Sequence, residues 1–197
     1  DRYGLSVYKD GLSVITTIDS SLQQAALESV AKNLYDYDKR HGWREPVNLQ
    51  SKISESVFEE LQTGNLEILY EESSTLDELG MKQLNVSVIR DFFEDLVNLD
   101  KHSGGIVIDV KPERVMYLNS SFQLESLFWD DSYKWARRKI DINKLGPRPQ
   151  NFYDILRRGD LIYLSEKNGN YYLDQVPDAE VAFISSDPSN GAIKTYI

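Results

Sequence analysis

The side chains best suited to bind a ligand lie late in the chain, in a short stretch that combines aromatic rings with guanidinium groups. The aromatic residues are Trp129, Tyr133 and Trp135, and Arg137 and Arg138 follow them. Rings beside cations are typical of surfaces that stack sugars or bases. The same residues also suit core packing with a cation–π contact, or docking against a neighbouring domain, and the sequence leaves these interpretations open.

A second candidate surface is acidic. The stretch 51–100 holds twelve acidic residues and three basic ones, whereas 133–158 holds eight basic residues and two acidic ones. Adjacent carboxylates work as an acid–base pair only where a cleft moves their pKa values apart, and neighbours on a helix or loop usually point apart. We therefore expect a solvated face or a partner-docking surface, for which the candidates are Glu59, Glu60, Glu71, Glu72, Asp77 and Glu78.

Composition excludes several classes of function. The net charge of −10 opposes binding to nucleic acid and to anionic lipid, which are held through clustered cations. The chain has no cysteine, and neither His41 nor His102 has a second histidine or an acid at ligand spacing. We expect no metal, no cofactor and no catalytic residue. The apolar runs are too short to span a bilayer, so we expect no membrane contact by this segment.

Before residue 100 the pattern is mostly helical. A β-branched run at 12–18 predicts a strand, and a helix follows it, with Ser20 and Gln23 spaced as a capping box and an end before Gly42. Its predicted buried stripe includes Ser29. A second amphipathic helix is expected around 53–61 with Gly64 as its C-cap, and a third over 86–99.

After residue 104 the apolar period changes to that of strands. We expect strands at 105–111, 114–119, 122–127, 161–165 and 171–175, a helix at 152–158, and irregular chain over 130–149. Asn168-Gly169 predicts a tight hairpin turn. Five short strands with one helix-bearing connection fit an oligonucleotide/oligosaccharide-binding (OB) type barrel. A last hairpin is expected at 180–185 and 192–196, and the predicted fold class is α+β.

Several runs of residues resemble one family in order and spacing. They are Leu12–Asp19 with Leu22–Ala26, Tyr37–Arg44, Trp135–Arg137, Leu145–Pro149 with Asp154–Leu156, Gln175–Pro177 and Asp187–Ile193. Together they resemble class A, bifunctional penicillin-binding proteins of the 1A type, in the region between the glycosyltransferase and transpeptidase domains. The segment 51–100 is where this chain departs from that pattern.

The resemblance implies four parts. These are a strand and helix from the edge of the transpeptidase domain (1–48), an acidic, partly helical insert (49–101), an OB-like antiparallel barrel (102–178) and the first transpeptidase hairpin (179–197). The strand at 12–18 and the last hairpin should then come together.

The resemblance also implies a non-catalytic regulatory module of a peptidoglycan synthase. It would lie on the periplasmic side of the bacterial inner membrane, in a parent anchored by an N-terminal helix. The expected partners are an outer-membrane lipoprotein activator and the parent's own two catalytic domains. Direct contact with peptidoglycan, or a plain spacer role, stays open as an alternative.

The family's transpeptidase motifs are not expected to work here. Ser29-Val30-Ala31-Lys32 and Ser6-Val7-Tyr8-Lys9 both match the Ser-x-x-Lys pattern of its nucleophile. Such matches are expected by chance in a serine-rich chain. The run Ile193-Lys194-Thr195-Tyr196 has a tyrosine where the Lys-Thr-Gly motif needs glycine, and no Ser-x-Asn motif occurs.

Overall fold

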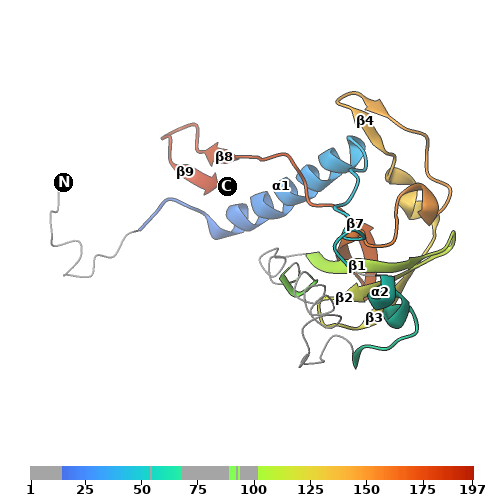
Figure 1. The fold of residues 1–197 in the computed structure, drawn as a ribbon. Coiled ribbons are helices and arrows are strands. Elements are labelled where there is room, and N and C mark those ends of the chain that lie inside the picture. The colour runs from blue at the N-terminus through green and yellow to red at the C-terminus, as the bar shows by residue number, and fades with distance from the viewer. Residues whose placement is uncertain (1–14, 54, 68–88, 92, 94–101) are drawn as a thin grey trace. The chain divides into compact units, whose positions relative to one another are not determined.

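A computed structural model describes residues 15–53, 55–67, 89–91, 93 and 102–197 of the chain. It separates two compact units (Figure 1). One unit comprises residues 37–177 and is called the barrel unit below, and the other comprises 1–36 with 178–197. The helix α1, Ser20–Arg40, runs from one unit into the other. Among the described residues, no helix is both long enough and apolar enough to cross a membrane.

The barrel unit is built on a five-stranded antiparallel sheet. The strand order is β3-β2-β1-β6-β7, and the edge strands β3 and β7 also contact one another, so the sheet curls towards a barrel. This confirms an α+β, OB-like antiparallel architecture. The strands are β1 (His102–Val110), β2 (Arg114–Asn119), β3 (Leu124–Phe128), β6 (Leu161–Lys167) and β7 (Asn170–Asp174).

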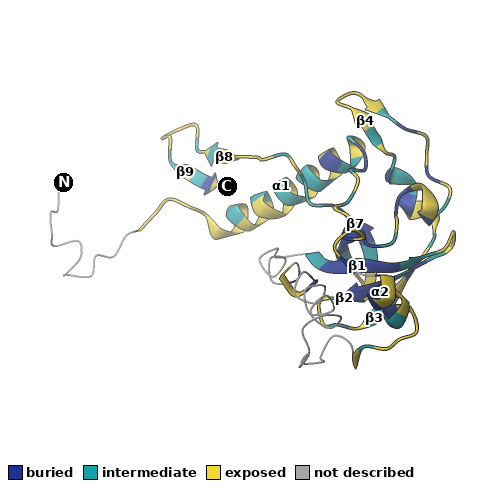
Figure 2. Cartoon of the chain, in the orientation of Figure 1, coloured by how far each residue is buried: buried dark blue, intermediate teal, exposed yellow. Residues whose placement is uncertain are grey.

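The central strand explains why the sheet has a hydrophobic core on both faces. Ile106 and Ile108 of β1 join one core cluster, while Val107 between them joins the other. This follows from the two-residue period of a strand, which sends successive side chains to opposite faces. Figure 2 shows β1 buried along most of its length. Such a strand appears in sequence as a continuous apolar run.

The first of these core clusters is completed by helix α2, Glu55–Gln62. Val57, Phe58 and Leu61 lie on one side of this helix and are fully buried, as the apolar spacing predicts. Gly64 follows the helix with a φ of +84°, which only glycine adopts without strain, so its predicted C-cap role is confirmed. Of the third predicted helix, residues 89–91 and 93 are described and are helical, whereas the rest lies outside the described residues.

Two predictions for residues 130–158 are wrong. The stretch predicted to be irregular contains the 3₁₀ helix η3 (Asp131–Trp135) and a hairpin of β4 (Lys139–Asp141) and β5 (Lys144–Leu145). The helix predicted at 152–158 is only the 3₁₀ turn η4, Phe152–Asp154. It ends early because Ile155 and Leu156 enter the core and the Arg157 N–H donates to the Asp160 carboxylate instead of continuing the helix.

The N-terminal cap of α1 differs from the predicted capping box. The carboxylate of Asp19, not Ser20, accepts the N–H groups of Ser21 and Leu22, at 3.0 and 3.1 Å. Gln23 is used elsewhere, because its amide exchanges hydrogen bonds with the backbone of Tyr196, at 2.8 and 3.0 Å. The helix ends before Gly42, as predicted.

The unit formed by 1–36 and 178–197 also contains the last hairpin, β8 (Ile184–Ser186) and β9 (Ile193–Tyr196). Residues 15–18 lie beside β9, since the Thr17 hydroxyl donates to Ile193 O at 2.6 Å and Asp19 N donates to Lys194 O at 3.0 Å. They form no strand, so the predicted strand at 12–18 is wrong over its described part. These two hydrogen bonds hold the segment against β9 without a regular ladder.

Candidate functional site

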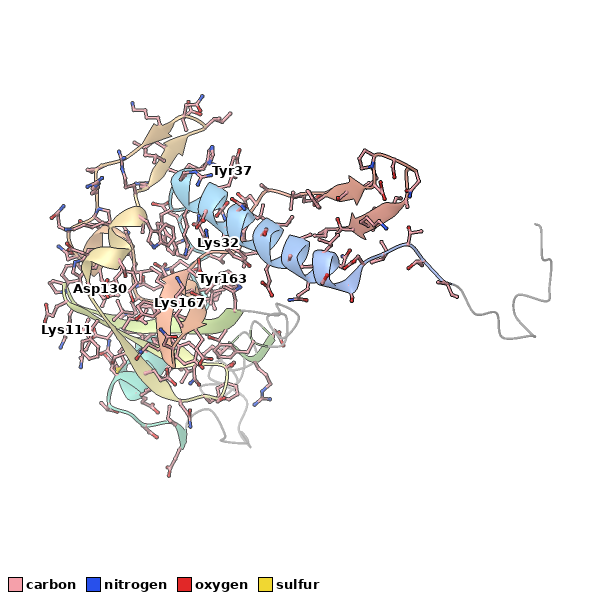
Figure 3. All side chains as sticks on the ribbon, turned by 180° about the vertical axis from the view of Figure 1, so that it is seen from behind. Lys32, Tyr37, Lys111, Asp130, Tyr163 and Lys167 are labelled. Atoms are coloured by element: carbon pink, nitrogen blue, oxygen red, sulfur yellow. The ribbon has the colours of Figure 1, made fainter. Side chains whose placement is uncertain are left out.

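The three aromatic residues singled out in the sequence are part of the packing of the barrel unit. Asp130 caps η3 by accepting the Ser132 N–H at 2.6 Å, and Figure 3 shows Asp130 in this part of the chain. This turn directs Tyr133 into the core, where it is 2% exposed. Trp129 packs against it, with 5.7 Å between ring centroids, and meets Phe152 edge-on at 5.2 Å. These faces contact protein, which favours the packing interpretation of the cluster.

Trp135 lies at the other end of η3 and also has protein neighbours. Its ring meets Trp43 edge-on at 5.6 Å between centroids. The Lys39 ammonium lies 5.0 Å from the Trp135 ring centroid, in cation–π geometry. The cation that stacks on this ring therefore comes from the last turn of α1 and not from Arg137 or Arg138.

The two arginines point to different partners. Arg137 Nε donates to Gly146 O at 2.8 Å, which ties η3 to the chain after β5. Arg138 forms an ion pair with Glu45 at 2.8 Å, and both of these side chains are about 60% exposed (63% and 60%). The structure thus divides the predicted aromatic–cation cluster between a packed core and an exposed ion pair. Its role as a glycan-contact or domain-contact surface stays a prediction.

A buried polar cluster that the sequence analysis did not find lies close by. It connects the chain where it enters the barrel unit, at 37–44, with the chain where it leaves, at 174–177. Arg44 forms an ion pair with Asp38 at 2.7 Å and donates to Val176 O at 2.5 Å. Gln175 Nε2 donates to Asp38 Oδ2 at 2.6 Å and to Gly42 O at 3.0 Å. We call Asp38, Lys39, Arg44, His102, Asp174 and Gln175 the junction cluster.

Asp174 is the charge at the centre of the junction cluster. Its Oδ1 lies 3.0 Å from Lys39 Nζ, and its Oδ2 lies 3.6 Å from His102 Nε2, an ion-pair distance that is too long for a strong hydrogen bond. Burial alone would raise the pKa of Asp174, but His102, Lys39 and the N–H of Gln175 outweigh burial and lower it to about 2. Asp174 is therefore ionised throughout the physiological pH range.

Gly42 allows the two chain segments to approach this closely. Its φ is +95°, and a Cβ there would lie 2.5 Å from Leu145 Cδ2 and 2.7 Å from Arg137 O. Trp43 continues the contact, because its N–H donates to Arg137 O at 2.7 Å and its indole donates to Ile155 O at 3.2 Å. The junction cluster thus holds the last turn of α1, the η3 region and the end of β7 as one packed body.

The sequence carried a signal for the junction cluster. Two of the runs quoted above, Tyr37–Arg44 and Gln175–Pro177, supply most of its members. The charged residues in these runs resemble ordinary surface residues in a single sequence. Only the fold shows that Asp38 and Asp174 are 4% and 5% exposed.

The acidic candidates are described only in part. Glu59 is exposed on the solvent side of α2, and Glu60 is half-buried, with a carboxylate oxygen 3.4 Å from Asn65 Nδ2. Glu71, Glu72, Asp77 and Glu78 lie outside the described residues. The acidic docking surface stays a prediction, of which Glu59 and Glu60 are the described members and Glu59 the exposed one.

The described Ser-x-x-Lys match has no catalytic geometry. Ser29 and Lys32 are both exposed on α1, and Lys32 Nζ pairs with Asp36 at 3.3 Å (Figure 3). The prediction that Ser29 lies on the buried stripe is wrong. The other match, Ser6 with Lys9, lies outside the described residues. In the described part of the chain, no group of three His, Asp or Glu side chains could hold a metal ion.

Comparison with known proteins gives a consistent result. Residues 73–179 match the family described as penicillin-binding protein OB-like domain. The whole chain is 32% identical to penicillin-binding protein 1A of Pseudomonas aeruginosa and 27% identical to penicillin-binding protein 1A of Escherichia coli, and it spans 20% of the length of each. The crystal structure of penicillin-binding protein 1A from Haemophilus influenzae has a similar fold, with a TM-score of 0.56 and 23% identity over 93% of this chain and 21% of that one.

Proposed function

The chain belongs to the penicillin-binding protein OB-like domain family, and on that premise we propose that it is the non-catalytic docking module of a bifunctional peptidoglycan synthase of the 1A type. The parent protein would polymerise glycan strands and cross-link their peptides. It would act on the periplasmic side of the bacterial inner membrane, anchored by an N-terminal helix. The module itself would bind a regulator, and an outer-membrane lipoprotein activator is the proposed partner.

The observation that carries the docking proposal is the way α2 sits on the barrel unit. Its apolar side is buried in the core through Val57, Phe58 and Leu61, while Glu59 faces solvent. The helix therefore places Glu59 at the surface of the barrel unit without using this carboxylate in the core, while Glu55 of the same helix pairs with Arg158. Acidic side chains at the surface suit a partner with a basic surface, since complementary charge steers association and selects the partner.

The alternative of direct glycan contact through the aromatic residues has less support. Tyr133 is buried, and Trp129 and Trp135 are half-buried, with other side chains against each ring. A ring that stacks on a sugar needs an open face, so Tyr133 is excluded and the ring area that the two tryptophans can offer is reduced.

The docking proposal is tested by capture from the host's own cell envelope. Replacing 51–100 by a flexible linker would strip Val57, Phe58 and Leu61 from the core, so that variant would confound folding with binding. The better variant neutralises the acidic candidates and spares the half-buried Glu60. It carries Glu59→Gln, Glu71→Gln, Glu72→Gln, Asp77→Asn and Glu78→Gln.

A matched control neutralises the same number of exposed acidic residues elsewhere. It carries Glu28→Gln, Glu113→Gln, Asp131→Asn, Asp141→Asn and Glu166→Gln. We expect the unaltered chain and the control to capture an outer-membrane lipoprotein, identified by mass spectrometry, and the acidic-segment variant to lose it. Equal capture by all three would remove the acidic segment as the site, and no capture by any of them would reject the docking function.

A further inference from the structure

Two adjoining clefts on the barrel unit together form one groove. One has a volume of about 360 Å³ and the other about 510 Å³, and both are lined by Gln50 and Arg157. The first extends from these residues towards Asn48 and Asp160, and the second towards Tyr153. The groove shares no lining residue with the junction cluster, and its second cleft is bordered by Gln62 at the end of α2.

Most charged groups of the groove already have partners in the fold. The Asp160 carboxylate accepts Asn48 Nδ2 at 2.6 Å and Arg157 N at 2.7 Å. Asp154 accepts the N–H of Gln150 at 2.7 Å and, within the capping box of η4, the N–H of Asn151 at 3.4 Å. The carboxylates of the groove are thus engaged in structure and do not need an external cation.

Three groups remain available to a ligand. The Arg157 guanidinium is exposed and interacts electrostatically with the nearby Asp160 carboxylate, but it forms no ion pair within 4 Å with any described residue. Arg158, in contrast, pairs with Glu55 and lies over the ring of Phe58. The Tyr153 ring is 56% exposed. The side-chain amide of Gln50 is exposed on the wall that both clefts share.

Backbone contacts fix the chain segments that carry these three residues. Gly159 has a φ of +85°, and a Cβ there would lie 2.8 Å from Gln50 N, so the chain that carries Arg157 crosses the chain that carries Gln50 in close contact. Leu49 N donates to Gly159 O at 2.8 Å and secures this crossing. Tyr153 N donates to Asn151 Oδ1 at 2.9 Å inside η4. The backbone positions of the site therefore need little reorganisation when a ligand binds, whereas the exposed side chains must be ordered by the ligand.

The chemistry of these groups defines one class of ligand. A free guanidinium selects a planar anion such as a carboxylate, which it binds through paired hydrogen bonds. An exposed tyrosine ring offers an apolar face that can cover the C–H face of a sugar, while its hydroxyl stays in water. A primary amide both donates and accepts hydrogen bonds, which matches the hydroxyl and acetamido groups of an amino sugar.

We propose that this groove binds a carboxylate-bearing amino-sugar oligosaccharide. Arg157 pairs with the carboxylate, Tyr153 covers a sugar ring, and Gln50 bonds to a hydroxyl or acetamido group. Identification of the ligand as a peptidoglycan glycan strand rests on the proposed function, because the muramic acid units of such strands carry a lactyl carboxyl group that is free once the peptide is removed.

The test is calorimetric titration of the full 197-residue chain with two probes. One probe is peptide-free glycan of alternating N-acetylglucosamine and N-acetylmuramic acid, and the other is the carboxylate-free tetramer of N-acetylglucosamine. The variants are Arg157→Ala and Tyr153→Ala. The controls are Arg148→Ala and Tyr171→Ala, which remove an exposed cation and an exposed tyrosine that do not line the groove.

We expect the muramic-acid glycan to bind, and Arg157→Ala and Tyr153→Ala each to weaken that binding by about tenfold, the loss expected for one charge-assisted or one stacking contact. The two controls should bind within about twofold of the unaltered chain. The tetramer should bind more weakly, and Arg157→Ala should not weaken it further.

Three results would overturn the inference. They are no binding of the muramic-acid glycan by the unaltered chain, binding by both groove variants as tight as that of the unaltered chain, and equal affinity of the unaltered chain for the two probes. Since the capture experiment uses a different part of the surface, loss of lipoprotein capture with intact glycan binding, or the reverse, separates this inference from the docking proposal.

Discussion

Asp174 determines how the junction cluster responds to acid. Its pKa is lowered from 3.8 to about 2, so the folded protein binds this proton less readily than the unfolded chain does. A depressed pKa gives stability that is fully present above the unfolded value and is lost as pH falls through the folded one. We expect Asp174 to contribute about 2 kcal/mol at neutral pH and to lose that contribution between about pH 4 and pH 2.

The variant Asp174→Asn tests this assignment. It should lower the free energy of unfolding at pH 7 by about 2 kcal/mol, because Lys39 would lose its carboxylate partner. The difference from the unaltered chain should shrink towards pH 2. Urea unfolding at a series of pH values measures both, and a difference that is constant over this range would contradict the assignment.

A second prediction concerns the stability effect of substituting Gly42. Gly42→Ala should destabilise the barrel unit by more than about 2 kcal/mol, because a left-handed backbone conformation costs a non-glycine residue about 1–2 kcal/mol and the new Cβ would collide with Arg137 O. Gly169→Ala is the matched control, since its φ is +77° but no atom lies within 4 Å of the new Cβ. Thermal unfolding of both variants separates collision from backbone strain, and equal losses would show that close approach at Gly42 is unimportant.

Sequence reasoning was weakest at this residue scale. It identified Trp129, Tyr133 and Trp135 as chemically notable, but a single sequence does not show whether an aromatic ring faces a ligand or the core. It did not single out Asp38 and Asp174, because the residue type alone does not show whether a carboxylate is buried or exposed. Their environment is created by contacts between residues 37–44 and 174–177, which are more than a hundred positions apart.

Among the secondary-structure elements, α2 carries the most specific prediction. Phe58 is fully buried and lies under the guanidinium of Arg158, with 5.1 Å between Arg158 Cζ and the ring centroid. Phe58→Ala should destabilise the barrel unit by about 3–5 kcal/mol through lost burial and the cavity left behind. Glu59→Ala, on the exposed side, should change stability by less than about 0.5 kcal/mol. Similar urea midpoints for the two variants would mean that α2 is not anchored in the core.

The elements were predictable where one local pattern determined them. The five sheet strands, α2 and the turn at Gly64 follow from apolar period and glycine placement, and the structure has them within a few residues. The exceptions depend on tertiary contacts. Residues 152–158 have the composition of a helix, yet Ile155 and Leu156 are drawn into the core and the helix stops after one turn. The hairpin β4–β5 is short and its isoleucines are exposed, so its sequence lacks the alternating apolar pattern that would predict strands.

For the whole molecule, the relevant property is the separation of charge along the chain. The acidic stretch 51–100 contrasts with a basic stretch at 133–158. If the acidic stretch binds a basic partner, salt should weaken the complex, because exposed charges are screened beyond about 10 Å at 0.1 M salt and beyond about 3 Å at 1 M. We expect the affinity for the captured lipoprotein to fall by at least about tenfold between 50 mM and 500 mM NaCl. An affinity independent of salt would place the interface on an uncharged surface.

The fold class and the family could be predicted for the whole molecule because the quoted runs span both ends of the chain. The division of the chain into two structural units was harder to predict from the sequence. The structure groups residues 37–48, α2 and the barrel strands in one unit, since they share the core and the junction cluster. The sequence-based boundaries at 48/49, 101/102 and 178/179 stay a prediction.

We proposed above that this chain regulates a synthase by docking a partner and takes no part in its chemistry. The most direct measurement compares the intact parent synthase with a parent carrying the five neutralised acidic residues, with and without the purified lipoprotein. If the docking proposal is right, we expect equal basal glycan polymerisation and cross-linking, and stimulation by the lipoprotein only in the unaltered synthase. Stimulation of both proteins, or loss of basal activity in the variant, would contradict it.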